Sequence, residues 1–421
     1  MTKAANIREH LFSLANRGIK YDLERIRKAA ARCGNPQLHY RSFHIAGTNG
    51  KGSTCTYIES VLRRGGYKTG LYSSPHIISF EERFLINGTA VEENAWLEVF
   101  ESQSGIIEEF CLSFFEAATL IAFELFKRNN VDWAVFETGL GGRLDATNII
   151  TPKVSVITGI AMDHTDYLGP TLLSIAGEKL GIVKRDCPLV FAKSNESAVM
   201  ELAKSICIEK NAPLKIVSDS DAQLIDGNKK GLNFLWNNLQ FHISLQGSFQ
   251  LRNALLALNA LQCAGITDYQ TLYEGLASAF IPGRFHIITR EKKTIVLDVG
   301  HNPDAASVLV AALKEKYHEK SICFVTGIMK DKDTGGILKQ YCSIANHIIF
   351  ARPQTDRAEL PENLLKLIEN EFGQQCEICS NVSSAVERAL TRGEEIICIA
   401  GSFYTVGEGY LALGIDPYKR S

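Results

Sequence analysis

Residues 43–54 read FHIAGTNGKGST, from Phe43 to Thr54, and this stretch decides how the first half of the chain folds. An apolar strand runs into three glycines, a lysine and two hydroxyl residues, and a helix is expected to begin near Thr54. Because glycines allow a close backbone approach, several N–H groups and the helix N-terminus can face the oxygens of an anion. Lys51 adds a positive charge, and Ser53 or Thr54 adds a hydroxyl group. The pattern therefore predicts a phosphate-binding loop, as in a nucleoside triphosphate site.

The spacing of this loop is G-x-x-G-K-G-S, which departs from the common P-loop pattern G-x-x-x-x-G-K-[ST]. The stretch is therefore a variant P-loop. A glycine turn that only joins a strand to a helix is the simpler alternative. The lysine and the two hydroxyl groups inside the turn favour the phosphate-binding interpretation.

The composition is that of a large globular chain with nearly balanced charge. The chain has 421 residues, too many for one ordinary core, so we expect two domains. Its 45 Lys and Arg residues against 47 Asp and Glu residues leave a net charge of −2, which offers no general attraction to nucleic acid or to an anionic membrane. The N-terminus lacks the apolar core of a signal peptide, and no apolar stretch is long enough to span a membrane. We therefore expect a cytoplasmic protein with no nucleic-acid or membrane partner.

Eleven cysteines are scattered along the chain, and we expect them to be reduced thiols because no export signal is evident. Cys376 and Cys379 form one C-x-x-C pair, but neither a second pair nor a nearby histidine completes a zinc site. The alternation within CEIC predicts a strand instead.

Strands and helices alternate along the first half of the chain. Strands are predicted within KTGLYSS, VDWAVFETGLGG and KVSVITGIAMDHT, and a helix is predicted over SFFEAATLIAFELFKRNN. This alternation predicts a mostly parallel sheet with helices on both faces, the α/β class. In such sheets ligands gather beyond the carboxyl ends of the strands. In this chain, polar residues cluster at the carboxyl ends of the predicted strands.

A second α/β unit is predicted to begin near Pro282-Gly283, after the helical stretch Leu251–Ala264. We predict a P-loop domain over residues 1–282 and a smaller, Rossmann-like α/β domain over residues 283–421. The second unit contains strands within TIVLDVGHNPD, SICFVTGIMKD, HIIFARP and EIICIAGSF. A nucleotide held by the first domain would lie in the cleft between the two domains.

Four polar side chains follow strands of the first domain and suit a complex of a metal ion with a nucleotide: Ser74, Glu137, His164 and Lys179. Glu137 ends the apolar run WAVFE, where an unpaired carboxylate is costly. Each residue also has a purely structural alternative. Ser74 could cap a turn, and Glu137 could pair with Arg143. His164 could be a buried histidine held by a neighbouring aspartate, and Lys179 could be a solvated lysine on a helix. A histidine nitrogen is an unusual ligand for Mg²⁺, so His164 indicates either tolerance of Mn²⁺ or a place behind the direct ligands.

Two further clusters suit organic ligands. In GLGGRLDATN (Gly139–Asn148), Asp145 would accept hydrogen bonds from the N–H and amino groups of a heterocycle. Phe115 would stack on such a ring, although ordinary core packing is the simpler interpretation. In the second domain, Asp298 and His301 end a strand and begin a helix, and NPD is also an ordinary helix start.

Six segments, in their order along the chain, resemble the folylpolyglutamate synthase/dihydrofolate synthase family, which is related to the Mur ligases. They are HIAGTNGKGST, YSSPHIISFEERFLING, GLGGRLDATN, DHTDYLGPTLLSIAGEKLGIVK, PGRF and DVGHNP, and the resemblance covers nearly the whole chain. The resemblance implies a first domain like the central domain of Mur ligases. It also implies an ATP-dependent ligase that joins L-glutamate to dihydropteroate, to folates or to both. Mg²⁺ with ATP as co-substrate, K⁺ as a further cofactor and a monomeric state are implied in the same way.

The resemblance also implies roles for individual residues. The residues expected at ATP are Thr48, Asn49, Gly50, Lys51, Gly52, Ser53, Asn253, Arg284, Asp298 and His301. Those expected at the metal are Ser74, Glu137, His164 and Lys179, with Lys179 carbamylated so that it supplies an anionic oxygen. The catalytic set is Lys51, Glu137, His164 and Lys179. The pterin pocket is expected to contain Phe115, Arg143, Asp145 and Ala146, with a contribution from the segment Asp22–Arg25.

The chain departs from the family pattern at a few positions. Val299-Gly300 stands where the family often has Gly-Ala or Val-Ala, Leu180 where alanine is usual, and Phe249 where histidine is common. None of these changes removes a charged or metal-binding group, so the catalytic assignment is unaffected.

The expected reaction has two steps. ATP phosphorylates the carboxylate of the pterin substrate, and the amine of glutamate then displaces phosphate from the acyl phosphate. The second domain is expected to bind glutamate and to close the cleft, which excludes water from the acyl phosphate.

Three other functions use some of the same motifs. An enzyme that only extends folates fits the same motifs. A Mur-type peptide ligase is disfavoured because Gly52 rather than threonine follows Lys51 and only 46 residues precede Gly47. A nucleotide-binding switch without ligase chemistry would need neither Glu137 nor Lys179.

Overall fold

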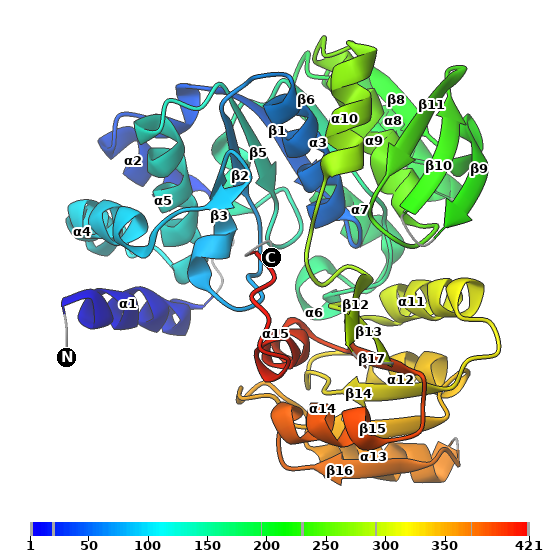
Figure 1. The fold of residues 1–421 in the computed structure, drawn as a ribbon. Coiled ribbons are helices and arrows are strands. Elements are labelled where there is room, and N and C mark those ends of the chain that lie inside the picture. The colour runs from blue at the N-terminus through cyan, green and yellow to red at the C-terminus, as the bar shows by residue number, and fades with distance from the viewer. Residues whose placement is uncertain are drawn as a thin grey trace.

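The computed structural model describes residues 3–18, 22–194, 196–228, 231–290, 293–371 and 373–418. Their strands form an eight-stranded, a three-stranded and a six-stranded sheet. Figure 1 shows the first two sheets in the upper part of the molecule and the six-stranded sheet below them. The polar ends of several strands face the region between the upper and lower parts.

The eight-stranded sheet is mostly parallel, as the alternation of strands and helices predicts. Its order is β4-β3-β2-β5-β1-β6-β7-β8, and β3 alone runs opposite to the other strands, so that it pairs antiparallel with both β2 and β4. The strands are β1 (Arg41–Ala46), β2 (Thr69–Tyr72), β3 (Phe84–Ile86), β4 (Thr89–Ala90), β5 (Trp133–Glu137), β6 (Val154–Ile157), β7 (Leu189–Ala192) and β8 (Leu214–Val217). The P-loop follows β1, which lies near the middle of this sheet.

Both faces of this sheet are buried, which is why its strands are apolar throughout. In β5, Trp133 and Val135 pack into one apolar cluster, whereas Ala134 and Phe136 pack into another on the opposite face. The first cluster lies under α3 (Lys51–Arg64), α9 (Gln250–Cys263) and α10 (Tyr269–Ser278). The second lies under α1 (Lys3–Ser13), α2 (Glu24–Arg32), α4 (Glu93–Glu109) and α5 (Phe114–Arg128). A third cluster packs under α7 (Leu172–Leu180) and α8 (Ser197–Glu209).

The three-stranded antiparallel sheet was not predicted from the sequence. It contains β9 (Ala222–Asn228), β10 (Gly231–Trp236) and β11 (Leu239–Ile243). Asn237 and Asn238, both with positive φ, form the two-residue turn between β10 and β11. An asparagine pair between two apolar runs is a hairpin signal. The motif WNNL is therefore a sequence signal for this hairpin.

The six-stranded sheet has the order β12-β13-β17-β14-β15-β16, and only β12 is antiparallel. Its strands are β12 (His286–Arg290), β13 (Lys293–Asp298), β14 (Ile322–Thr326), β15 (His347–Ala351), β16 (Cys376–Cys379) and β17 (Ile396–Ala400). Its helices are α11 (Pro303–Lys316), α12 (Thr334–Cys342), α13 (Pro361–Glu371), α14 (Val382–Thr391) and α15 (Phe403–Ala412). The strand predicted over CEIC is confirmed as β16. All eleven cysteines are free thiols.

Within the ranges that the structure describes, none of the helices combines the length and the apolar character that crossing a membrane requires.

Candidate active site

Two adjoining cavities lie between the upper and lower parts of the molecule and share part of their lining. The polar cavity, of about 740 Å³, is lined by the P-loop, the ends of β5, β6 and β13, and the first turn of α11. The aromatic cavity, of about 700 Å³, is lined by rings such as Phe114, Phe115, Tyr167 and Tyr404. Both are lined by Ser74, Pro75, Gly139, Leu140, His164, His301 and Phe403. Ligands in the two cavities would therefore lie on either side of the same residues.

The predicted site residues gather in these two cavities. The polar cavity is lined by Thr48, Asn49, Gly50, Lys51, Ser53, Asn253, Arg284, Asp298 and His301, and by Ser74, Glu137, His164 and Lys179. Of the residues expected at ATP, Gly52 alone does not line it. A Cβ at Gly52 would lie 3.3 Å from Ile281 Cδ1. The aromatic cavity is lined by Phe115, Arg143, Asp145, Ala146 and also Asp22. Residues 19–21, next to Asp22, lie outside the described residues.

The backbone of the P-loop can be built only with glycine at two positions. A Cβ at Gly47 would lie 2.0 Å from Thr158 Oγ1, and a Cβ at Gly50 would lie 2.4 Å from Asn253 Oδ1. Both glycines also have positive φ values, 152° and 86°. The helix α3 begins at Lys51, three residues earlier than expected, so the N–H groups of its first turn point toward the cavity.

Lys51 folds back over its own loop. Its ammonium group donates to the carbonyl oxygens of Gly47 at 3.1 Å and Thr48 at 3.2 Å. Carbonyl groups leave the positive charge uncompensated. An anion placed in the loop would therefore meet both this charge and the backbone N–H groups.

Glu137, at the end of β5, is buried beside this loop. Burial raises the pKa of its carboxyl group, and the charges of Lys51 and Arg284 oppose that rise. Oε2 accepts one hydrogen bond, from the backbone N–H of Ser74 at 3.3 Å. The alternative pairing of Glu137 with Arg143 is wrong, because Arg143 forms an ion pair with Glu178 at 2.8 Å. Glu137 therefore keeps acceptor capacity for a cation.

Lys179, in α7, is also buried, so the alternative of a solvated lysine is wrong. Its Nζ donates to the carbonyl oxygen of Gly47 at 2.9 Å. Burial, followed by the charge of Lys51, lowers the pKa of Lys179 to about 7. A large share of this amine is therefore neutral near pH 7, which an amine must be in order to react as a nucleophile.

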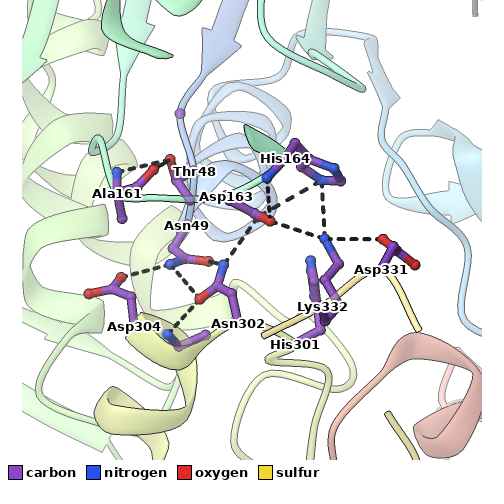
Figure 2. Close-up of polar contacts among 12 residues, drawn as sticks. Thr48, Asn49, Ala161, Asp163, His164, His301, Asn302, Asp304, Asp331 and Lys332 are labelled. Carbon is purple, nitrogen blue, oxygen red and sulfur yellow. Dashed lines mark hydrogen bonds and ion pairs between the residues drawn. The ribbon is translucent and has the colours of Figure 1, made fainter. Parts of the chain in front are cut away.

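His164 precedes the short helix α6 (Thr165–Leu168) and has a left-handed backbone, with φ of 51°. Burial lowers the pKa of its imidazole to about 4, although Asp163 opposes this shift. Figure 2 shows His164 and Asp163 facing Lys332, whose Nζ lies 3.4 Å from His164 Nε2 and 3.0 Å from Asp163 Oδ1. The neutral ring can offer a nitrogen lone pair. Asp163 and Lys332 were not singled out from the sequence, although both follow strands.

Within the described part of the chain, no three His, Cys, Asp or Glu side chains are grouped so that they alone would hold a metal ion. One carboxylate, one hydroxyl group, one imidazole and one neutral amine instead line the same cavity, from Glu137, Ser74, His164 and Lys179. Conversion of the amine to a carbamate would add a second anionic oxygen ligand. With the oxygens of a bound triphosphate, this set suits a hard divalent cation.

Asp145 holds its own loop together. Its Oδ2 accepts from the N–H groups of Gly139 at 2.8 Å and Leu140 at 2.9 Å. Its Oδ1 accepts from Thr147 N at 3.0 Å and from Thr147 Oγ1 at 2.5 Å. Because both oxygens already accept two hydrogen bonds, a heterocycle would have to share this carboxylate with the loop. The sequence predicted only the hydrogen bonds to the heterocycle.

Phe115 is half-buried at the wall of the aromatic cavity. Its ring lies against Gly139, where a Cβ would come within 2.5 Å of Phe115 Cζ, and 6.0 Å from the ring of Tyr72. The ring is therefore supported by the protein while the residue also lines the cavity. This arrangement suits stacking of a planar ring.

Arg83 is a functional candidate that the sequence analysis missed. Its guanidinium is buried, lies 5.8 Å and 5.4 Å from the ring centroids of Phe80 and Phe114, and donates from Nε to His76 Nδ1 at 3.0 Å. Burial lowers its pKa, and no ion pair to a carboxylate is formed by it within the described residues. Because it also lines the aromatic cavity, this charge suits a ligand carboxylate. The only sequence signal was its place in YSSPHIISFEERFLING.

The lower part of the molecule contributes three of the predicted residues. Asp298, buried at the end of β13, accepts from Phe285 N and Gly300 N, each at 2.8 Å. Arg284 and His301 lie against the Phe403 ring, at 5.4 Å and 5.8 Å from its centroid. These residues give the polar cavity an aromatic and cationic wall opposite the P-loop.

Comparison with protein-family models gives two matches. The Mur ligase middle domain matches residues 45–261, and the Mur ligase glutamate ligase domain matches residues 283–403. We refer to these two segments below as the middle domain and the glutamate ligase domain.

Curated relatives match along nearly the whole chain. The dihydrofolate synthase/folylpolyglutamate synthase of Escherichia coli is 34% identical over 405 residues, which cover 94% of this chain and 92% of the relative. The protein of the same name from Bacillus subtilis is 33% identical over 413 residues, covering 93% and 94% of the two chains.

Solved structures are also similar to this chain along nearly its whole length. E. coli FolC in complex with DHPP and ADP superposes with a TM-score of 0.88 at 32% identity, covering 98% of this chain and 99% of that chain. A bifunctional folylpolyglutamate synthase/dihydrofolate synthase with Mn, AMPPNP and L-glutamate bound has a TM-score of 0.85 at 30% identity, covering 97% and 98%.

Proposed function

The chain belongs to the dihydrofolate synthase/folylpolyglutamate synthase family. We propose that its two adjoining cavities each bind one of the substrates of a single ligation reaction. The protein is an ATP-dependent ligase that joins L-glutamate to dihydropteroate and to folates. The polar cavity receives ATP and the aromatic cavity receives the pterin acid. The observation that carries this division is that the cavities share a lining at Ser74, Gly139 and His164, where a phosphoryl group and a carboxylate would meet.

On the nucleotide side, the P-loop N–H groups and Lys51 hold the phosphates, and Arg284, Asp298 and His301 hold the rest of the nucleotide. Lys51 is suited to this role because its ammonium group has only carbonyl partners in its own loop. As the terminal phosphoryl group moves, its equatorial oxygens stay within reach of this charge. Fixed charges of this kind stabilise the transition state without reorganisation.

A divalent cation accompanies ATP and, when bound, neutralises phosphate charge. Ser74, Glu137, His164 and carbamylated Lys179 would hold it. Lys179 is suited to carbamylation because its pKa of about 7 leaves much of the amine neutral. The neutral amine nitrogen bonds to the carbon of CO₂ and releases one proton, so the amine becomes an anionic carbamate.

On the acid side, the pterin ring stacks on Phe115 while the carboxylate reaches the junction of the cavities beside Arg83. One carboxylate oxygen bonds to the terminal phosphorus of ATP, ADP leaves, and an acyl phosphate forms. The amine of glutamate then bonds to the carbonyl carbon, and phosphate leaves with that oxygen. A free carboxylate resists this second step because it is anionic and lacks a good leaving group.

The glutamate ligase domain would receive the glutamate, and its contact with the middle domain would keep water from the acyl phosphate. The boundaries at residues 1–282 and 283–421, the K⁺ ion and the monomeric state stay predictions. A cytoplasmic location is also part of the proposal, and it is supported by eleven free thiols, which suit a reducing compartment.

The test measures ADP release and amide formation with ATP and glutamate, comparing dihydropteroate with tetrahydrofolate. We expect both acids to support turnover and hydroxylamine to trap a hydroxamate during it. Turnover with tetrahydrofolate alone would reduce the function to chain extension. ATP turnover that depends on neither acid would contradict the proposal.

A further inference from the structure

We propose that Asn302, in the glutamate ligase domain, is a positioning residue that holds the P-loop through Asn49 when the two domains are in contact. This inference rests on the proposed ligase function and adds a residue that governs how tightly ATP use is coupled to amide formation. We call Asn49 and Asn302 together the asparagine bridge. Figure 2 shows the two side chains facing each other across the domain boundary.

The asparagine bridge uses every amide hydrogen that its two side chains have. Asn49 Nδ2 donates to Asp304 Oδ2 at 2.7 Å and to Asn302 Oδ1 at 3.4 Å. Asn302 Nδ2 donates to Asn49 Oδ1 at 3.3 Å and to Asp163 Oδ2 at 3.2 Å. All four bonds cross between the middle domain and the glutamate ligase domain, and each asparagine is both donor and acceptor. Asn302 is only 2% exposed, so water does not replace these partners.

The backbone of Asn49 is fixed separately, inside the middle domain. Thr158 Oγ1 donates to the carbonyl oxygen of Asn49 at 2.6 Å. The neighbouring Thr48 exchanges hydrogen bonds with Ala161, donating from Oγ1 at 3.1 Å and accepting from N at 3.0 Å. The loop therefore keeps its own shape, and the Asn49 side chain is the part that reaches the other domain.

The asparagine bridge also connects the P-loop with His164. Asp163 accepts from Asn302 Nδ2 through Oδ2 and from the backbone N–H of His164 through Oδ1 at 2.9 Å. Lys332 donates to the same Oδ1 at 3.0 Å. One hydrogen-bonded path thus joins the phosphate loop, the first turn of α11 and the residue proposed beside the cation. Separation of the domains would break this path at the asparagine bridge.

Helix capping alone does not account for Asn302. As the N-cap of α11 it needs only Oδ1, which accepts from Ala305 N at 2.8 Å. Asn381 caps α14 in the same way, accepting from Ser384 N at 2.9 Å, but its Nδ2 donates only to the adjacent Ser380 Oγ at 3.4 Å. The interdomain bonds of the Asn302 amide are therefore additional to the cap, and Asn381 provides a matched control.

Loss of the asparagine bridge should let water reach the acyl phosphate. Water then attacks the acyl phosphate in place of the glutamate amine. The pterin acid is regenerated and phosphate is released, so one ATP is hydrolysed without formation of an amide. The number of ADP molecules released per amide formed reports this directly. A residue that only stabilises α11 would lower both products together and leave the ratio unchanged.

The decisive variants are Asn302→Ser and Asn49→Ala, with Asn381→Ser as the control. Serine keeps the N-cap oxygen but lacks the amide hydrogens, so the melting temperature of Asn302→Ser should match that of Asn381→Ser. We expect the rate of amide formation by Asn302→Ser to fall by about tenfold, which corresponds to the loss of about one or two hydrogen bonds. This variant should also release clearly more than one ADP for each amide that it forms. Asn381→Ser should keep both the rate and the ratio.

The double variant tests whether the two asparagines act as one unit. Asn49→Ala combined with Asn302→Ser should lose little more than the more damaging single variant. A ratio that stays at one ADP per amide in both single variants, or losses that multiply in the double variant, would overturn the asparagine bridge. Failure of the proposed function is distinct, because the unaltered enzyme would then form no amide.

Discussion

The polar and the aromatic cavity differ in how the chain builds them. The polar cavity is centred on one contiguous loop, Gly47–Lys51, whose backbone and single lysine form its phosphate-binding surface, while more distant side chains such as Arg284 and Asp298 complete its walls. The aromatic cavity takes its surface from side chains that are far apart in sequence, such as Arg83, Phe115 and Tyr404. A contiguous backbone site depends on a few irreplaceable groups, whereas a dispersed site divides its binding energy among many.

This difference predicts two kinds of response to mutation. Changes in the polar cavity should lower the rate of catalysis, because its charges act on the moving phosphoryl group. Changes in the aromatic cavity should mainly raise the KM for the pterin acid, because its side chains bind the acid equally in the ground state and in the transition state.

Lys51→Ala should have the largest effect. The ammonium group is the P-loop's only cationic side chain between Gly47 and Thr54, so kcat should fall by about a thousandfold, with a much smaller change in the KM for the pterin acid. Steady-state assays of amide formation measure both. Lys204→Ala, which removes an exposed lysine paired with Glu201 at 2.8 Å, is the control and should be silent.

Arg83→Met should follow, with a different signature. Methionine keeps the apolar bulk between Phe80 and Phe114 but removes the charge, so the KM for the pterin acid should rise by about thirtyfold to a hundredfold. The melting temperature of the free enzyme should not fall, since a buried guanidinium without a carboxylate partner is costly. A lower melting temperature with an unchanged KM would mean that Arg83 is structural, and the comparison of the two cavities would lose its main support.

Lys179 gives the polar cavity a dependence on pH and CO₂. Its pKa of about 7 lies below the usual value of a lysine, so the reactive neutral amine makes up about a tenth of the group at pH 6 and about nine tenths at pH 8. Enzyme incubated with bicarbonate at pH 8 should therefore be about tenfold more active than enzyme incubated without CO₂ at pH 6, when both are assayed at the same pH. Lys179→Ala should show no response to bicarbonate, and a response in that variant would place the effect elsewhere.

The same lowered pKa has a consequence for stability. Between about pH 7 and the usual pKa of a lysine, the Lys179 amine carries a proton in the unfolded chain but not in the folded chain. The free energy of unfolding therefore rises with pH across this interval. Lys179→Met should therefore stabilise the protein most below pH 7, where burial of the ammonium group is fully felt. Denaturation curves at pH 6 and pH 9 measure this, and an equal difference at both pH values would contradict the shift.

Phe115→Leu should have the smallest effect of the series. A stacked ring contributes about 0.5–1.5 kcal/mol beyond its buried area, so the KM for the pterin acid should rise by about threefold to tenfold. The KM for ATP should stay unchanged. A large fall in kcat would show that the aromatic cavity also governs the chemical step.

The contrast between the cavities also explains what could be predicted from the sequence. The P-loop was predictable because the glycine, lysine and hydroxyl residues expected to bind phosphate together are neighbours in the chain. The strand β1, the helix α3 and the parallel sheet follow from the apolar pattern around them. Arg83 and Lys332 were missed because their roles depend on what faces them, and those partners come from distant elements. Nothing in a linear pattern distinguishes a buried arginine without a carboxylate from a solvated one.

Asp145 and Asn49 show a subtler limit. Both were expected to contact a ligand, and both line the expected cavities. In the structure, the Asp145 oxygens accept from their own loop and the Asn49 amide reaches the other domain. A residue type and a motif predict where a side chain lies, but the hydrogen-bond partners decide how much of it is free for a ligand.

The central claim is that a carboxylate held in the aromatic cavity takes the terminal phosphoryl group of ATP held in the polar cavity. Dihydropteroate labelled with ¹⁸O in its carboxylate tests this directly, because the oxygen that bonds to phosphorus leaves with phosphate. The account predicts one ¹⁸O atom in the inorganic phosphate for each amide formed. Inorganic phosphate without ¹⁸O, from an enzyme that still forms the amide, would contradict it.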